Sequence, residues 1–270
     1  MERLAEVRPA RLLVVADGPR KERPDDLALC AEAQRIATAP AWRCEVLTDV
    51  SETNLGCRDR IASGLDWVFE TVEAAIVLED DCLPAASFFP FCGELLARYR
   101  DDQRVGAILG TNLSGAQPPS GASYFFSRVF HPWGWASWRR VWRDYDRRLA
   151  QLDTAEELGI LESAFADPRV RGFFADKFAR VRRGEIDTWD FQLGLTLLAR
   201  SSLVVTPAET LVANLGCARE DATHTADETT LGTAAAAELE LPLRHPSLIA
   251  PFRRADLAVE QICLALRVSG

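Results

Sequence analysis

Three consecutive carboxylates follow a wholly apolar segment of the chain. Glu79, Asp80 and Asp81 come directly after residues 74–78. Adjacent like charges at the end of a buried strand cost electrostatic free energy unless a cation or hydrogen-bond donors compensate for them. Carboxylate oxygens suit Mg²⁺ and Mn²⁺, which keep several waters and bridge to substrate phosphates. The cluster therefore predicts a Mn²⁺ or Mg²⁺ site, and the alternative is a solvated acidic turn.

A second pair of carboxylates, Asp187 and Asp190, lies where a helical pattern begins. A carboxylate at such a place serves either as a general base or as a helix N-cap. A helix N-terminus lowers a carboxylate's affinity for protons, so a base there requires neighbouring acids or burial as compensation. From the residues alone, both roles stay open at both positions.

Five short apolar segments alternate with helical patterns along most of the chain. The predicted strands are 11–16, 43–48, 74–78, 105–109 and 203–206. The predicted helices are 24–39, 58–72, 87–100, 154–182, 189–200 and 253–267. This alternation predicts an α/β fold with a mostly parallel sheet flanked by helices. Ligands in such sheets bind at the carboxyl ends of the strands, where the cluster at 79–81 lies.

The regular alternation stops after residue 110. Residues 114–123 are rich in Gly, Pro and Ser and lead into an aromatic segment, residues 124–142, where we expect a lid or an acceptor loop. Three tryptophans in it recur at helical intervals, namely Trp135, Trp138 and Trp142. This spacing favours core positions for at least two of them. Trp133 lies between a proline and a glycine, and we expect it to line the donor or acceptor pocket.

Composition limits the class of protein. The chain has 270 residues, 48% of them hydrophobic, which is enough for a full α/β core. Its net charge of −9 argues against nucleic-acid binding, which requires a basic face. The seven cysteines are scattered without Cys-x-x-Cys pairs, as is typical of reduced thiols. No apolar stretch of about 20 residues and no signal-peptide pattern is found, so we expect a cytoplasmic protein.

The run Glu79-Asp80-Asp81 resembles the E-D-D form of the D-x-D motif of GT-A glycosyltransferases, especially the bacterial relatives of N-acetylglucosaminyltransferase I. Four other motifs follow the order found in that family: Ala-Asp-Gly-Pro-Arg at 16–20, Asn-Leu-Gly-Cys-Arg at 54–58, Trp-Gly-Trp-Ala-Ser-Trp-Arg at 133–139 and Asp-Thr-Trp-Asp at 187–190. Each motif is short, but together they extend over roughly residues 11 to 225 in the family's order.

The resemblance implies a GT-A (Rossmann-like) domain over residues 1–215 and a C-terminal extension, 216–270, packed on it. It implies a metal-dependent, inverting transfer of a sugar from a nucleotide diphosphate donor, a UDP-sugar, to a hydroxyl of a glycan or glycolipid acceptor. The oligomeric state is not predicted.

For the donor, the resemblance places Asp17 and Arg20 near the nucleoside or the phosphates and Arg58 near the base or the diphosphate. A glycine before Arg58 and the start of a helix favour an anion there. Arg20 lies in a basic run, and a solvated turn is the alternative. Glu79 and Asp80 are assigned to the donor as well, Asp80 on the ribose or the donor sugar.

For the metal and the chemistry, the resemblance assigns Asp81 as the direct ligand and Asp190 as the general base. Asp187 is the competitor of Asp190. His224 is a candidate second metal ligand, since many relatives add a C-terminal histidine, and an ordinary surface histidine is the alternative.

Two other functions compete with this hypothesis. A sugar-nucleotide pyrophosphorylase would open with a Gly-rich loop and a following basic residue, whereas here the first strand ends in Ala-Asp-Gly-Pro-Arg. A catalytically inactive nucleotide-sugar-binding relative would be expected to lack the carboxylate at 81 or 190, and both are present. Residues 253–267 carry arginines at both ends, so they either pack against the domain or make a peripheral contact with an anionic membrane at its inner face.

Overall fold

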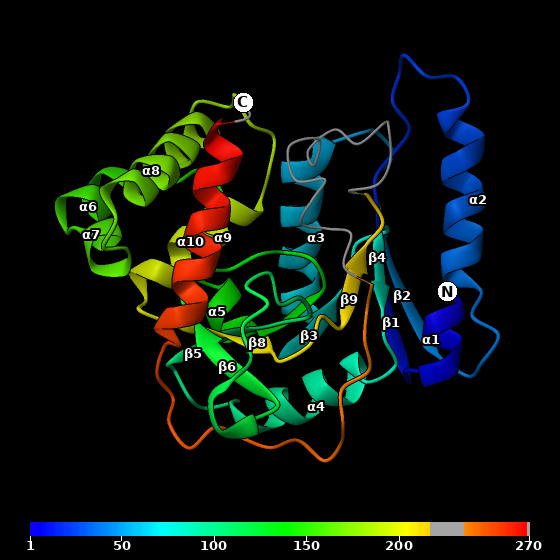
Figure 1. The fold of residues 1–270 in the computed structure, drawn as a ribbon. Coiled ribbons are helices and arrows are strands. Elements are labelled where there is room, and N and C mark those ends of the chain that lie inside the picture. Colours follow the sequence, from blue (N-terminus) through cyan, green and yellow to red (C-terminus); the bar gives the residue numbers. More distant parts are fainter. Residues whose placement is uncertain (217–234, 269–270) are drawn as a thin grey trace.

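The computed structural model describes residues 1–216 and 235–268 and shows a mixed α/β fold (Figure 1). The strands are β1 (Arg11–Ala16), β2 (Glu45–Val50), β3 (Ala74–Val77), β4 (Cys82–Pro84), β5 (Val105–Leu109), β6 (Tyr124–Ser127), β7 (Trp135–Trp138), β8 (Leu203–Pro207) and β9 (Val212–Asn214). The helices are α1 (Glu2–Val7), α2 (Asp26–Thr38), α3 (Gly56–Thr71), α4 (Phe88–Arg98), α5 (Arg139–Trp142), α6 (Leu152–Glu157), α7 (Ile160–Ala164), α8 (Pro168–Arg182), α9 (Asp190–Ala199) and α10 (Arg253–Val268). The α/β class predicted from the sequence is confirmed at this level.

The strands form three hydrogen-bonded groups. β1 and β2 pair in parallel, β4 and β9 pair antiparallel, and the largest sheet has the order β3-β7-β5-β8-β6. In the largest sheet only β5 and β8 pair in parallel, and the other three pairings are antiparallel. The predicted mostly parallel sheet is therefore not confirmed. Because β3 and β5 both run antiparallel to β7, the strands β3, β5 and β8 nevertheless share one direction.

The antiparallel strands come from the aromatic segment. β6 and β7 lie inside residues 124–142, which we expected to form a loop, and the helical interpretation of Trp135 and Trp138 is wrong because both lie on β7. All residues of β7 are buried, so the strand shows no alternation of polar and apolar side chains. The expected core positions are confirmed, since Trp135, Trp138 and Trp142 are 1%, 3% and 5% exposed.

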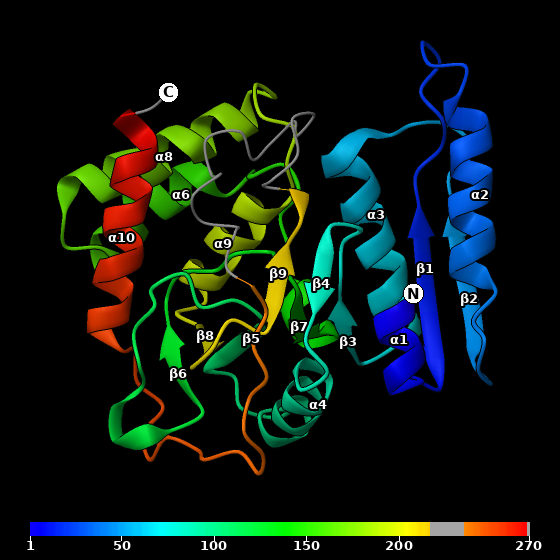
Figure 2. The same ribbon diagram turned by 45° about the vertical axis from the view of Figure 1, so that its right-hand side comes forward.

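Helices cover this sheet and join it to the β1–β2 pair. On α4, Phe88, Phe91, Cys92 and Leu95 recur at helical spacing and are each 0% exposed, which places one full face of the helix in the core. α3 contacts both β1 and β3. Both views show β1, β2 and α2 on one side of the molecule and α6, α8 and α10 on the other, with α3 between them (Figures 1 and 2).

The single helix predicted over residues 154–182 is wrong, because three helices, α6, α7 and α8, occupy this range. Gly159 adopts φ 65° between α6 and α7, a conformation that glycine adopts without strain. Asp167 accepts a hydrogen bond from the amide of Arg169 at 2.8 Å, and Pro168 begins α8. A capping aspartate followed by proline is a strong helix start, and it interrupts the helical pattern.

α10 packs against α8 and β6. Asp256 on its inner face is 1% exposed and accepts hydrogen bonds from Ser127 Oγ at 2.7 Å and from the amide of Arg128 at 3.3 Å. Glu260, also 1% exposed, pairs with Arg253 on the same helix. The predicted C-terminal helix is thus held at β6 by the buried carboxylate of Asp256. In the described part of the chain, no helix combines the length and apolarity needed to cross a membrane.

The chain around β9 crosses the ends of β5 and β7 at short range. The amides of Leu211 and Val212 donate to the carbonyl oxygen of Gly110 at 2.7 and 3.0 Å, and the amide of Gly110 donates to the carbonyl oxygen of Gly134 at 2.7 Å. A Cβ on Gly134 would lie 2.7 Å from Cγ2 of Val212, and a Cβ on Gly110 would lie 2.4 Å from the same atom. Two glycines therefore let β9 approach the sheet.

Gly134→Ala should lower the free energy of unfolding by about 2–4 kcal/mol, measured by urea denaturation. Gly134 has φ 68°, so the new side chain meets both backbone strain and Val212. Gly115→Ala is the matched control, because Gly115 has φ 61° and open space around its Cα. The control should lose only about 1 kcal/mol. Equal losses in the two variants would show that the contact with Val212 contributes nothing.

Candidate active site

The carboxylate cluster lies at the edge where β3 and β5 end and β7 begins. Val77 and Leu109 both pair with Trp135, so these three residues form one row across the sheet. Glu79 follows this row after Leu78 on the β3 side, and Gly110 follows it directly on the β5 side. The parallel direction of β3 and β5 therefore brings the cluster to the edge that β9 crosses.

Glu79 shows that distant parts of the chain meet here. Burial, followed by the charges of Asp81, Asp190 and Asp80, raises the pKa of Glu79 to about 8. These interactions require Asp190, from the start of α9, to lie close to the cluster from the end of β3. The structure therefore brings together the candidate metal ligand, the candidate base and Glu79.

Asp81 is half-buried and is enclosed by the end of β9. Its backbone carbonyl accepts a hydrogen bond from the amide of Leu215 at 2.8 Å, and its Oδ1 lies 3.7 Å from the thiol of Cys82, which donates to it. A hydrogen bond with the side chain of Asn214 favours the ionised form, but burial and the charge of Asp80 outweigh it and raise the pKa of Asp81. A Cβ on Gly216 would lie 2.4 Å from Oδ2 of Asp81.

Asp190 is the first residue of α9, and its position is set by its neighbours. The hydroxyl of Thr188 donates to Oδ1 of Asp190. Trp189 is 2% exposed and stacks on Trp135 of β7, with ring centroids 5.5 Å apart and an interplanar angle of 26°. Tyr145 donates its hydroxyl to the carbonyl oxygen of Trp189 at 3.1 Å. The start of α9 is thus fixed against the sheet beside the cluster.

Two carboxylates occupy the N-terminus of α3. Asp17, directly after β1, accepts hydrogen bonds from the amides of Leu55 and Gly56 at 2.9 and 3.1 Å. Asp187 accepts hydrogen bonds from the next two amides, those of Cys57 at 3.1 Å and Arg58 at 3.3 Å. The helix start that the sequence predicted as an anion site therefore holds two anions of the chain itself.

The two predicted donor-binding arginines have carboxylate partners. Arg20 makes a two-pronged ion pair with Asp26, with Nε–Oδ2 2.6 Å and Nη2–Oδ1 3.0 Å. This pair lies between β1 and the start of α2, and the structure provides no contact from Arg20 to the cluster. Arg58 lies 3.2 Å from Asp59 through its Nε. The amide of Arg58 is held by Asp187, whose charge also acts on the thiol of Cys57 in the site.

The remaining predicted residues have different environments. Asp80, the middle residue of the cluster, is exposed. Trp133 is only 8% exposed, and its carbonyl oxygen accepts a hydrogen bond from Thr111 Oγ1 at 3.1 Å. His224 lies outside the described residues.

Cys57 is a site residue that the sequence analysis did not single out. The pKa of its thiol is raised to about 12, mainly by burial. The charges of Glu79, Asp187, Asp190 and Asp81 raise it further. The thiol therefore lies among carboxylates from two separate segments, residues 79–81 and 187–190. The only available signal was its place within the 54–58 motif. Asn214, beside Asp81, had no local signal, because β9 is only three residues long.

The carboxylates of the cluster fit a divalent cation. Within residues 1–216 and 235–268, no Lys, Arg or His side chain forms an ion pair with Glu79, Asp80 or Asp81. The same part of the chain contains no group of three or more His, Cys, Asp or Glu side chains arranged as a metal site. Mg²⁺-type ions commonly use one or two carboxylates together with waters and substrate phosphates, so Asp81 with a diphosphate suffices in principle.

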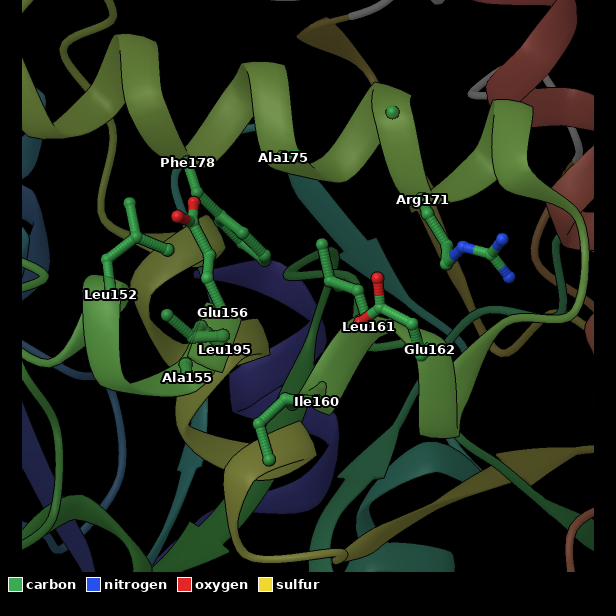
Figure 3. A pocket seen from close by; sticks show the side chains of 11 residues that line it. Leu152, Ala155, Glu156, Ile160, Leu161, Glu162, Arg171, Ala175, Phe178 and Leu195 are labelled. Carbon is green, nitrogen blue, oxygen red and sulfur yellow. The ribbon is translucent and has the colours of Figure 1, made fainter. Parts of the chain in front are cut away.

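A separate cavity of about 260 Å³ lies among α6, α7, α8 and α9 (Figure 3). Its lining is mainly apolar and includes Leu152, Phe178 and Leu195, with Arg171 at the other side of the view. None of the predicted site residues lines it. The cavity therefore plays no part in the site at the strand ends.

Comparison with known proteins gives no assignment, because no family model matches the chain and no curated protein matches it. The function is therefore argued from the residues of the site.

Glu79→Gln should change how stability depends on pH. The pKa of Glu79 rises from an ordinary 4.5 to about 8 on folding, so the folded protein holds this proton more tightly than the unfolded chain. Wild-type stability should therefore fall as the pH rises through this window, and the variant should lose this part of the fall. Urea unfolding at pH 5 and pH 8 in the presence of a chelator measures the effect.

The matched control is Asp80→Asn, which removes one charge at the exposed residue of the same cluster. From pH 5 to pH 8, the free energy of unfolding of Glu79→Gln should increase relative to that of wild type. The corresponding increase for Asp80→Asn should be smaller. A difference that stays constant with pH would show that Glu79 is ionised throughout.

Proposed function

We propose that this chain is a metal-dependent glycosyltransferase that moves a sugar from a nucleotide diphosphate donor, a UDP-sugar, to a hydroxyl of a glycan or glycolipid. The observation that carries the proposal is the convergence of Glu79 and Asp81, from the end of β3, with Asp190, from the start of α9. These residues are far apart in the chain, and each belongs to a motif that resembles the GT-A family.

Charge supports a cation and a diphosphate at this edge. Glu79 and Asp81 both have raised pKa values because of burial and of neighbouring carboxylates, so the site favours a bound positive charge. Asp81 holds Mn²⁺ or Mg²⁺ in this proposal, and the ion stabilises the charge that develops on the leaving diphosphate. Asp80, exposed beside it, is left to contact the ribose or the donor sugar.

Asp190 is the proposed general base. A base at a helix start requires burial or neighbouring acids, and Asp190 is partly buried and lies near Glu79. The stack of Trp189 on Trp135 holds the backbone of this residue, and the hydroxyl of Thr188 holds its carboxylate. A fixed carboxylate is what proton removal from an acceptor hydroxyl requires.

The arrangement of strands supports a GT-A fold as the finer form of the α/β class. β1 and β2 are parallel, and β3, β5 and β8 share one direction, with β7 inserted antiparallel. We propose residues 1–215 as the catalytic domain and 216–270 as its extension, in a cytoplasmic protein. Asp17 has a structural role within this proposal, because its carboxylate is engaged by backbone amides of the loop before α3.

The first test incubates the protein with Mn²⁺ and a panel of nucleotide sugars and measures the release of nucleoside diphosphate. We expect release from at least one UDP-sugar, and we expect chelator to abolish it. Asp81→Asn should reduce release to background and weaken the binding of UDP with Mn²⁺ in calorimetry, because the cation loses its protein anchor.

Glu70→Gln, at an exposed position of α3, is the charge-matched control and should retain the activity. A requirement for pyrophosphate would instead indicate a pyrophosphorylase, and tight binding without turnover would indicate an inactive relative. Full activity in Asp81→Asn with chelator present would exclude the proposed metal site.

The second test concerns Asp190. Asp190→Asn keeps the shape and much of the hydrogen bonding but cannot accept a proton, so kcat should fall by about 10²–10⁴-fold while donor affinity changes little. A single displacement also inverts the anomeric configuration, which NMR of the product reads independently. A product that keeps the donor's configuration, or near-normal turnover of the variant, would remove Asp190 from the mechanism.

A further inference from the structure

The segment that carries Asp190 is attached to the rest of the protein at two points. At one end, Asp187 binds the amides of Cys57 and Arg58 in the first turn of α3. At the other end, Trp189 stacks on Trp135 of β7. Only Thr188 separates these two attachments, and Asp190 follows directly.

We infer that Asp187 is a positioning residue: its carboxylate ties the segment carrying Asp190 to the N-terminus of α3 and so sets the place of the proposed base. Its effect on turnover rests on the proposed function, whereas the tie itself is independent of it. Asp187 and Asp190, whose roles the sequence alone leaves interchangeable, thus have different tasks.

The hydrogen bonds of Asp187 show why it suits this task. Oδ2 accepts the amide of Cys57 and Oδ1 accepts the amide of Arg58, so both oxygens are used. The amides of Leu55 and Gly56 are already held by Asp17, so Asp187 receives the pair of donors that remains in this turn. Backbone amides at a helix start are hydrogen-bond donors without a partner in the helix, so a carboxylate that accepts two of them is a good helix cap.

Gly56 shows how closely the two segments fit. It adopts φ 80°, and a Cβ at this position would lie 2.9 Å from Oδ2 of Asp187. The loop before α3 therefore gives the carboxylate direct access to the amides. The same turn carries Cys57, whose thiol lies among the carboxylates of the site, so a shift of Asp187 would move the proposed base relative to Glu79 and Asp81.

Asparagine and alanine at position 187 distinguish a positioning role from a base. An asparagine side chain has one acceptor oxygen, so it keeps one of the two amide hydrogen bonds of Asp187 but cannot take a proton, whereas alanine keeps neither hydrogen bond. Asp187→Ala should reduce kcat by about 10–100-fold with little change in the donor KM, since a small displacement of a reacting group is costly. Asp187→Asn should lose less kcat than Asp187→Ala, because one hydrogen bond to α3 remains, whereas Asp190→Asn should lose about 10²–10⁴-fold.

Amide hydrogen exchange measures the attachment of the Asp187 segment to α3 without requiring enzymatic turnover. In Asp187→Ala, exchange should become about fivefold faster at Cys57 and Arg58 and also faster in the first turn of α9. In Asp187→Asn the increase should be smaller at both places, because one of the two amide hydrogen bonds is kept. Asp167→Ala, which removes the equivalent cap from α8, is the matched control and should leave kcat and these amides unchanged.

The two measurements separate failure of the inference from failure of the proposed function. If the protein transfers no sugar from any donor, the proposed function fails, and linked exchange at α3 and α9 still supports the tie. Faster exchange at α3 with an unchanged first turn of α9 would overturn the positioning role. A loss of kcat in Asp187→Asn as large as in Asp190→Asn, with normal exchange, would overturn it as well and make Asp187 a proton acceptor.

Discussion

The concentration of negative charge at one edge of the central sheet is the constraint on which the rest of the structure depends. Glu79, Asp81 and Asp190 meet there, and burial with mutual repulsion makes the ionised form of Glu79 unfavourable at neutral pH. The fold must supply enough apolar packing to hold these groups together. The core of α4 and the tryptophans of β7 provide it, and a bound cation would relieve the remaining repulsion.

Close contacts to the backbone, together with the stack of Trp189 on Trp135, place the site groups. β9 reaches Asp81 because Gly110 and Gly134 leave room for Val212. α3 begins beside the site because two carboxylates hold its first amides. Such contacts tolerate little displacement, because interiors are closely packed, so they fix the relative positions of strands and helix ends. The result is a site whose geometry is set by the rigid part of the fold.

The sequence predicts those parts of the fold that have a local signal. Strands 11–16 and 105–109 were predicted with their observed bounds, because they are apolar and turn residues follow them. β7 was missed because both its faces are buried, which removes the alternation of a half-exposed strand. The cluster at 79–81 could be predicted from its position after a strand. The capping of α3 by Asp187 could not, because nothing near residue 56 encodes it.

The cap on α3 also has a consequence for the order of folding. The carboxylate that completes the first turn of this helix lies 130 residues further along the chain. Contacts of such separation close a long loop and form late, since the loop entropy is lost before the contact contributes. During synthesis, α3 therefore lacks its complete N-terminal cap until the ribosome has released residue 187. The N-terminal half of the site becomes fully ordered only when the second half of the domain has emerged.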